Sequence, residues 1–296
     1  MLSIDNTTFN KFLPNVFATV EGESTLYEKC EDFLEQGKDL LEQYFIGVDY
    51  LPAETATSSS QVEGAEESEA EENVYADCLS YAQRLVCIHA VILAIPSIDL
   101  VLTPNGFGVV NSSDVVPASA DRVERLISML VKQKNDIMRM LQYKLLLVPA
   151  WQETRWFKFW KETMFGDISS LHALDGSKDM DLIDFLLIAK PKILTIEKKL
   201  SDCFFGKEII DVLRKSALLG YNDSNTERVY LANCLVAEIV KMYNGNIGQF
   251  YAFPFIDYIR KHKSSFPEWE ASEFGQYYEA PDYYENKKEN GGFWFS

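Results

Sequence analysis

Apolar residues recur at three- and four-residue spacing along most of the chain, which predicts a mainly helical protein. In the first half this spacing predicts helices at 25–45, at 74–95 and from Ser119 to about residue 143, with Ser119 at the position of an N-cap. The helix at 74–95 is apolar on nearly every side, so we expect it at the centre of the fold.

The second half repeats the helical pattern, with predicted helices at 179–200, 207–219, 226–243 and 255–263. Pro191 should kink or divide the first of these helices, because it lacks a backbone N–H and clashes with the preceding turn. Gly220 stands where a C-terminal cap of the second helix is expected.

Between the helices predicted at 74–95 and from Ser119, residues 98–110 change to short apolar, β-branched runs on either side of Pro104, Asn105 and Gly106. Asn-Gly tolerates the positive φ angles that a tight turn needs. The sequence therefore predicts a small β-hairpin here.

Two segments lack any helical or alternating period. Residues 52–73 hold seven glutamates and no basic residue, which predicts a flexible acidic loop or, as the alternative, a docking tether for a basic partner. Residues 266–296 are rich in aromatic side chains, with seven acids and two bases, which predicts an extended tail. Its aromatic side chains are expected to order either in grooves of a neighbouring protein or against the tail's own domain.

Two helix–loop–helix units resemble each other, since Glu72-Asn73-Val74-Tyr75 and Glu227-Arg228-Val229-Tyr230 each follow a polar loop and open an apolar helix. The predicted fold is mainly α: a helical bundle of two similar helix–loop–helix units with a small β-hairpin, plus an extended C-terminal tail. The predicted domains are a first helical unit with the acidic loop and the hairpin at 1–150, a Trp-rich linker segment with the second helical unit at 151–265, and the aromatic tail at 266–296.

Charge changes the picture of possible partners. The chain has 296 residues and a net charge of −17, which disfavours general binding to nucleic acids or to anionic membranes. The longest apolar run, 86–96, is too short to cross a bilayer, and no signal peptide is evident at the N-terminus. The five cysteines show no CxxC spacing, so we expect buried free thiols.

Residues that carry chemistry are few. The sequence contains no HExxH motif, no Walker-type glycine loop and no EF-hand spacing. We expect a core role for the first of the three histidines, a loop position for the second and a solvated position for the third: His89, His172 and His262. Carboxylate pairs arise by chance in a chain with 45 acids, as in Asp179 with Asp181 and Asp175 with Asp184. The prediction is a protein that is not an enzyme, with no catalytic, metal or cofactor site.

Three tryptophans within ten residues are unusual, and basic residues separate them. Such a segment can stack on single-stranded nucleic acid, but the acidic chain favours a core position or an anchor between subunits. The predicted interface residues come from this segment and from the tail: Trp151, Trp156, Trp160, Tyr277, Tyr278, Tyr283, Tyr284, Phe293, Trp294 and Phe295.

The stretch 102–110, followed by Pro117-Ala118-Ser119 and by Arg122-Val123-Glu124-Arg125-Leu126, resembles proteins encoded by phages and prophages of Bacteroidetes, including crAss-like phages. Those proteins are taken to be head–tail connector or head-completion proteins, and the resemblance extends over about 9–245. It carries no catalytic residue over to this chain.

The resemblance implies a homo-oligomeric, twelvefold ring beneath a portal, in contact with the portal and with adjacent tail or ring proteins. It further implies that DNA passes through the channel without specific binding. The expected location is the head–tail junction of a virion whose subunits are made in the host bacterial cytoplasm, with no membrane partner. The alternative is a non-viral helical interaction module that docks through its acidic loop and its aromatic tail.

Overall fold

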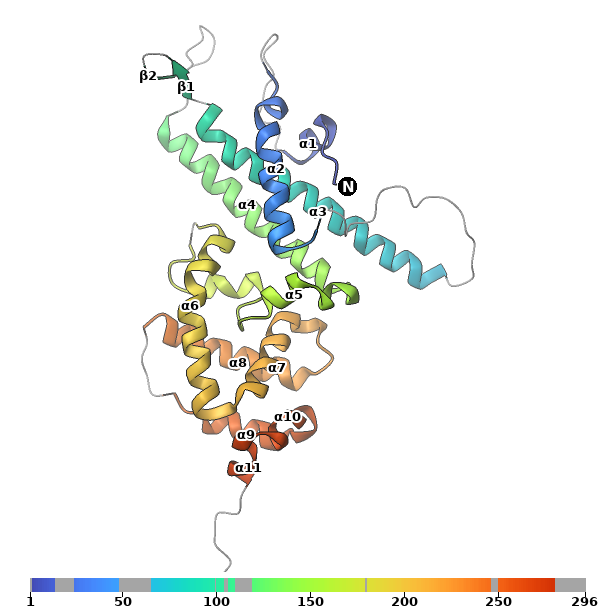
Figure 1. Ribbon diagram of the computed structural model, residues 1–296, viewed down its shortest axis with the longest axis vertical. Coiled ribbons are helices and arrows are strands. Elements are labelled where there is room, and N and C mark those ends of the chain that lie inside the picture. Colours follow the sequence, from blue (N-terminus) through green and yellow to red (C-terminus); the bar gives the residue numbers. More distant parts are fainter. Residues whose placement is uncertain are drawn as a thin grey trace, which may run out of the picture.

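The computed structural model describes residues 2–13, 24–47, 65–98, 100–103, 106–109, 119–178, 180–245 and 250–279, without the side chains of 65–73 and 100–109. Within these ranges the chain is mainly helical, which confirms the fold class that the periodicity predicts. The molecule is elongated, and helix α5 (Arg155–Trp160) lies between its two parts (Figure 1). We call the part before residue 147 the arm and the part after residue 148 the body.

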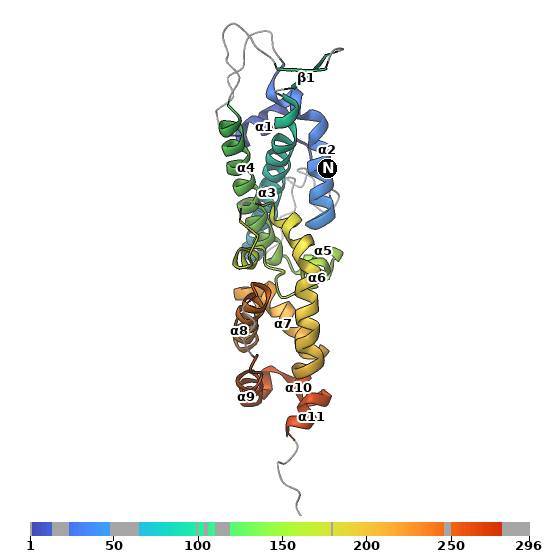
Figure 2. The same cartoon turned by 90° about the vertical axis from the view of Figure 1, so that its left-hand side faces the viewer.

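The arm contains four helices, α1 (Asn6–Phe12), α2 (Leu26–Tyr44), α3 (Ala65–Ile98) and α4 (Ala120–Leu146). Helix α3 lies between α2 and α4 and packs against both (Figure 2). Four consecutive α3 side chains are fully buried, from Leu85 to Ile88, because the helix has neighbours on opposite sides. The prediction of a central apolar helix is therefore confirmed.

Helix α2 begins at a capping box, in which Thr25 Oγ1 accepts from the Glu28 N–H at 3.3 Å and Glu28 Oε2 accepts from the Thr25 N–H at 2.8 Å. Both N–H groups belong to the helix end and lack a partner inside the helix. The hydroxyl group of Thr25 and the carboxylate of Glu28 thus fix where this helix starts.

At the far end of the arm, β1 (Leu100–Thr103) and β2 (Gly106–Val109) pair antiparallel, with Leu100 opposite Val109 (Figure 1). The predicted turn residues Pro104 and Asn105 lie outside the described residues.

The body continues from the arm through α-helices, short 3-10 helices and one π-helical turn, η3. Its elements are η1 (Pro149–Glu153), α5, η2 (Ile168–Ala173), α6 (Leu182–Leu200), η3 (Ser201–Phe205), α7 (Lys207–Leu219), η4 (Gly220–Asn222), α8 (Thr226–Tyr243), α9 (Phe253–Lys261), η5 (Lys263–Ser265), α10 (Pro267–Ala271) and α11 (Glu273–Glu279). Helix α8 packs against α6 and α7, and α11 lies at the end of the molecule opposite the hairpin (Figure 1).

The prediction of an acidic loop at 52–73 is wrong for its last nine residues, because α3 already begins at Ala65. Alanine and glutamate have high helix propensity, and acids near a helix N-terminus interact favourably with the helix dipole. Residues 52–64 lie outside the described residues.

The prediction of an extended tail from residue 266 is wrong for its first part, which forms α10 and α11. Phe266 and Trp269 are fully buried, and Arg228 forms an ion pair with Glu268 at 2.9 Å. Burial of these side chains offsets the conformational entropy that the segment loses when it becomes ordered. The sequence pattern does not reveal this burial.

Pro191 lies inside α6, which runs from Leu182 to Leu200 as one helix, so the proline does not divide it. Thr195 Oγ1 donates to the Pro191 carbonyl at 2.8 Å.

By length and composition alone, Val74–Ile98 of α3 is apolar enough to cross a membrane, although the shorter run 86–96 suggested otherwise. Its mean hydropathy is 1.7, and half of the apolar window is buried inside the fold. The position of α3 between α2 and α4 accounts for this composition, because a core helix needs the same apolar surface.

Gly37 sets how closely α2 approaches α3. A Cβ atom at this position would lie 2.9 Å from Val86 Cγ1 and 2.9 Å from the Val86 carbonyl oxygen. Backbone atoms cannot move aside as a flexible side chain can, so only glycine allows this crossing.

We therefore expect Gly37→Ala to lower the free energy of unfolding by about 1–3 kcal/mol, although alanine favours helix by about 1 kcal/mol over glycine. Urea unfolding of the purified protein measures the change. The control is Gln36→Ala, which alters the exposed neighbour on the same helix. A Gly37→Ala protein as stable as the control would contradict the close approach.

Candidate functional site

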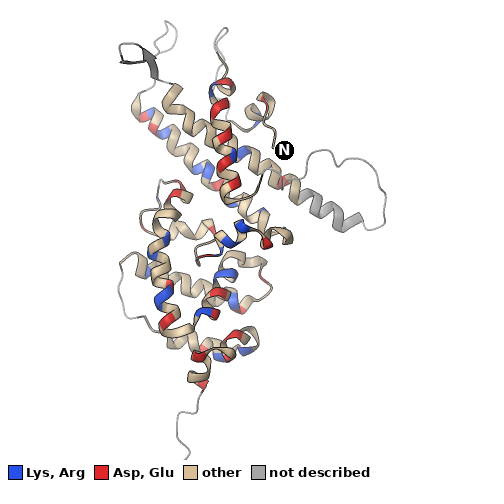
Figure 3. Ribbon diagram, in the orientation of Figure 1, with Lys and Arg blue, Asp and Glu red and all other residues tan. Residues whose placement is uncertain are grey.

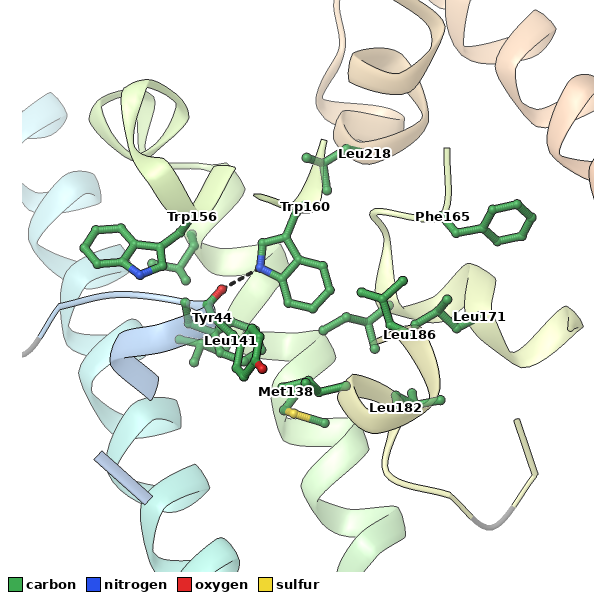
Figure 4. Close-up of a cluster of buried hydrophobic side chains, with 14 of the residues drawn as sticks. Tyr44, Met138, Leu141, Trp156, Trp160, Phe165, Leu171, Leu182, Leu186 and Leu218 are labelled. Atoms are coloured by element: carbon green, nitrogen blue, oxygen red, sulfur yellow. Dashed lines mark hydrogen bonds between the residues drawn. The ribbon is translucent and has the colours of Figure 1, made fainter. Parts of the chain in front are cut away.

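The three tryptophans of the segment 151–160 close the C-terminal end of helix α2. The last carbonyl groups of a helix have no partner inside it and must find a donor elsewhere. Each indole N–H donates to one of these carbonyl oxygens: Trp156 to Glu42 at 2.6 Å, Trp160 to Tyr44 at 2.6 Å and Trp151 to Phe45 at 2.7 Å. Figure 4 shows the bond from Trp160 to Tyr44.

The same side chains fill the junction between arm and body. Trp151 and Trp160 are 0 % and 1 % exposed, Trp156 is 9 % exposed, and the ring of Trp160 lies 5.4 Å from that of Phe45. Of the two positions left open by the sequence, core and subunit anchor, the structure places all three in the core of their own chain. Their ring faces are therefore not available for stacking on nucleic acid bases.

The aromatic residues of the tail fall into two groups. Tyr277 is 76 % exposed, and Tyr278 stacks on buried Trp269 with ring centroids 6.0 Å apart. The two tyrosines, Tyr277 and Tyr278, line a shallow hollow at the end of the body together with Phe274 and Cys203. The other predicted interface residues, Tyr283, Tyr284, Phe293, Trp294 and Phe295, lie outside the described residues.

A buried polar cluster joins the arm to helix α6. Lys134 of α4 is 3 % exposed, lies 3.0 Å from His89 Nδ1 of α3 and forms an ion pair with Asp181. An ammonium group can only donate, so Nδ1 accepts and the neutral ring carries its proton on Nε2. Burial and the Lys134 charge lower the pKa of His89 to about 4, against the opposing effect of Asp181.

Asp181 is also the N-cap of α6, and its Oδ1 accepts from the Ile183 N–H at 3.0 Å. Beside it, Asn135 donates to the Met180 carbonyl at 3.0 Å and accepts from the Leu182 N–H at 3.2 Å. Helix α4 therefore holds the first turn of α6 through charged and neutral hydrogen bonds together. The prediction that His89 is a satisfied residue is confirmed, and its side chain is partly rather than fully buried.

A second buried charge joins elements within the body. Glu197 of α6 is fully buried; it accepts from the Met164 N–H at 2.7 Å and from Arg214 Nε at 2.8 Å. Burial raises the pKa of this carboxyl group, while the Arg214 guanidinium opposes the rise. Arg214 also pairs with Asp211 at 2.9 Å, so its positive charge is shared between two carboxylates.

The remaining candidates for chemistry are dispersed. His172 is exposed in η2, and His262 is half-buried and stacked on Tyr258 rather than solvated. Asp179 lies outside the described residues, so the pair with Asp181 has no described geometry. Among the residues that the structure describes, no group of three or more His, Cys, Asp or Glu side chains is placed to hold a metal ion.

The cysteines are free, as expected, but not all are buried. Burial raises the pKa of Cys30 to about 11 and those of Cys78 and Cys87 to about 12, so these thiols remain protonated and unreactive at neutral pH. Cys203 is exposed, which corrects the expectation for that residue.

Lys134 and Glu197 were not predicted from the sequence as residues that join helices. The position of each in its helix nevertheless indicates this role. Lys134 lies in the apolar stripe that includes Leu130 and Ile137, and Glu197 lies in the stripe that includes Ile193 and Leu200. A charge on the core-facing stripe of a helix must be paired when it is buried.

The fold and these sites define a mainly helical protein whose buried charges and indoles are used in joints between helices. Residues 22–155 match the model of a family of unknown function, DUF6712. The matched range contains α2, α3, α4 and Trp151, and so includes one of the indoles that close α2. No curated protein and no solved structure matches the chain.

Because indole N–H groups satisfy the C-terminal carbonyl groups of α2, removing one of them should lower the free energy of unfolding. We expect Trp160→Phe to lower the free energy of unfolding by about 1–3 kcal/mol more than Trp269→Phe, since a buried carbonyl group loses its donor. Trp269 is the matched control because it is equally buried and its Nε1 has no acceptor among the described residues. Equal losses in urea unfolding would show that the Trp160 bond contributes nothing.

The His89 cluster predicts a dependence of stability on pH. The folded pKa, about 4, lies below the ordinary value of 6.5, so the unfolded chain binds a proton first as the pH falls. Stability is therefore full above pH 6.5 and decreases by at most roughly 3 kcal/mol as the pH falls towards 4. Asp184, whose pKa burial and Asp181 raise, acts in the opposite direction at the acid end.

Urea unfolding at pH 7 and pH 4.5 measures this difference. In His89→Gln an amide oxygen can still accept from Lys134, and the difference between the two pH values should shrink. His172→Gln, which alters an exposed histidine, should leave the difference as it is. A wild-type difference retained in full by His89→Gln would refute the assignment.

Proposed function

We propose that this protein is a non-catalytic structural subunit of a phage virion, a head–tail connector that forms a ring beneath the portal. The observation that carries the proposal is the elongated shape of the subunit, in which a flat layer of long helices continues into a second helical part (Figures 1 and 2). Such a subunit suits a ring wall, since neighbours can meet along the whole length of the layer. The resemblance of residues 102–126 to phage connector proteins supports the same function.

The internal chemistry is consistent with a structural role. Lys134, Glu197 and His89 are each paired within the fold and connect separate helices. The net charge of −17 is suited to a channel through which DNA moves without specific binding. We therefore propose a twelvefold homo-oligomeric ring in contact with the portal and with adjacent tail or ring proteins, at the head–tail junction of a virion assembled in the bacterial cytoplasm.

We further propose that the bundle consists of two similar helix–loop–helix units with a small β-hairpin and a C-terminal tail. In support, α2 packs against α3 in the arm, and α7 packs against α8 in the body. The second helix of each pair contains a Val-Tyr step, Val74-Tyr75 in α3 and Val229-Tyr230 in α8.

Sedimentation velocity and negative-stain imaging of the purified chain, alone and with the portal protein of the same phage, test the connector function. We expect closed rings of twelve chains in at least one of the two conditions. A monomer or dimer that portal protein leaves unchanged would contradict the proposal and would favour a helical interaction module instead.

A further inference from the structure

The outward face of α2 carries one straight line of carboxylates. Its members are spaced four, three, four and three residues apart, so they lie along one side of the helix: Glu28, Asp32, Glu35, Asp39 and Glu42. All five are exposed, and the buried residues of α2, from Cys30 to Tyr44, face the other way. The two basic residues of the helix lie beside this line; Lys38 pairs with Glu35 at 2.6 Å. We call these five residues the acidic line.

The outward face of α4 carries a different line, also spaced by three and four residues. It consists of Arg122, Arg125, Met129, Lys132, Asp136, Arg139, Tyr143 and Leu147, the last being the C-cap of the helix. All of them are exposed, and three are large apolar residues with 39–48 % of their surface accessible. Arginine, tyrosine and methionine are enriched in protein interfaces. We call these eight residues the basic line.

The two lines lie on opposite sides of the arm. Helix α3 lies between α2 and α4 (Figure 2). The buried residues of each outer helix lie on the side opposite its line, so the two lines face away from each other. Figure 3 shows where acids and bases occur along the two ribbons. At 1.5 Å per residue, the acidic line is about 21 Å long, and the stretch from Arg122 to Arg139 is about 25 Å long. One subunit thus presents two lines of similar length and opposite charge on its two sides.

Like charges three and four residues apart destabilise a helix that stands alone. Among the described residues, the ion pairs that offset this repulsion are weak exposed ones, such as Arg155 with Glu42 at 3.8 Å. A partner that brings a matching row of positive charges relieves the repulsion along the whole line. The α4 face of a second copy carries four positive residues, Arg122, Arg125, Lys132 and Arg139, which are three, seven and seven residues apart. Asp136 lies in the same line and pairs with Arg139 at 3.2 Å, so the positive charge is strongest from Arg122 to Lys132.

We propose that the acidic line on α2 of one copy docks on the basic line on α4 of the next copy. This contact rests on the proposed ring function and deepens it, because it names the two surfaces that meet. The interface joins two different faces of the same chain, and such a contact forms a ring when the rotation between neighbouring copies closes, as the proposed function requires. The order α4–α3–α2 then continues into the α4–α3–α2 layer of the neighbour as one wall.

Charge exchange between two variants tests this contact. The α2 variant carries Asp32→Lys and Asp39→Lys, and the α4 variant carries Arg125→Glu and Lys132→Glu. Each variant alone brings like charges together at every contact, so the concentration for half-assembly should rise more than about tenfold. A mixture of the two restores opposite charges at every contact and should assemble into rings of alternating variants.

Sedimentation velocity, in whichever condition the wild-type chain assembles, reports the outcome, and circular dichroism confirms that each variant is folded. The matched control for the α2 variant, Glu153→Lys with Glu270→Lys, makes the same change in net charge at exposed positions off both lines and should assemble like the wild type. Raising the salt concentration from about 0.1 M to 1 M should weaken wild-type assembly, since screening shortens from about 10 Å to 3 Å.

The possible failures are distinct. Rings of normal affinity from either variant alone, or a mixture that stays as dispersed as its components, would overturn this contact and leave the ring function standing. A wild-type chain that stays monomeric with and without portal protein would overturn both.

Discussion

Burial of the C-terminal end of helix α2 is the constraint on which the arrangement of arm and body depends. A helix end presents carbonyl groups that water normally satisfies, and here that end is covered by the aromatic residues of η1 and α5. Burial without donors would cost roughly 1–3 kcal/mol for each carbonyl group. Three indole N–H groups remove that cost, and because they come from one short segment they fix its position on α2.

The joint between α4 and α6 and the joint between α6 and α7 also depend on buried polar side chains, with fewer side chains in each. Lys134 and Asn135 of α4 hold the first turn of α6, while Glu197 connects α6 to α7 through Arg214. Each is a buried polar group with specific partners, and such groups select one arrangement of helices because any other leaves them unpaired. Hydrophobic packing supplies most of the stability, whereas these bonds orient the helices. The same orientation leaves the charged faces of α2 and α4 exposed on opposite sides of α3.

Local signals predicted the helices well because each acts over a few residues. Thr25 and Gly220 lie at helix ends, where capping chemistry places them. The apolar period found the long helices of both halves but not the short helices α1, α10 and α11. Two local inferences failed where local and tertiary effects compete. Residues 65–73 of the acidic run are helical because their Ala and Glu residues favour helix. The segment after Phe266 is ordered because Trp269 is buried.

The capping role of the tryptophans was beyond reach of the sequence, since Trp151 and its acceptor Phe45 lie 106 residues apart and no periodicity links them. The lines on α2 and α4 were visible as spacing, but only the position of α3 between them shows that they face opposite ways.

Zero-length carbodiimide crosslinking of an assembly made from isotopically light and heavy copies tests the proposed wall most directly. Within one copy Lys132 and the acidic line lie on opposite sides of α3, so a crosslink between Lys132 and Asp32, Glu35 or Asp39 must join two copies. We predict that mass spectrometry finds such crosslinks as mixed light–heavy peptides. An assembly in which Lys132 crosslinks between copies only to carboxylates outside the acidic line would contradict the arrangement.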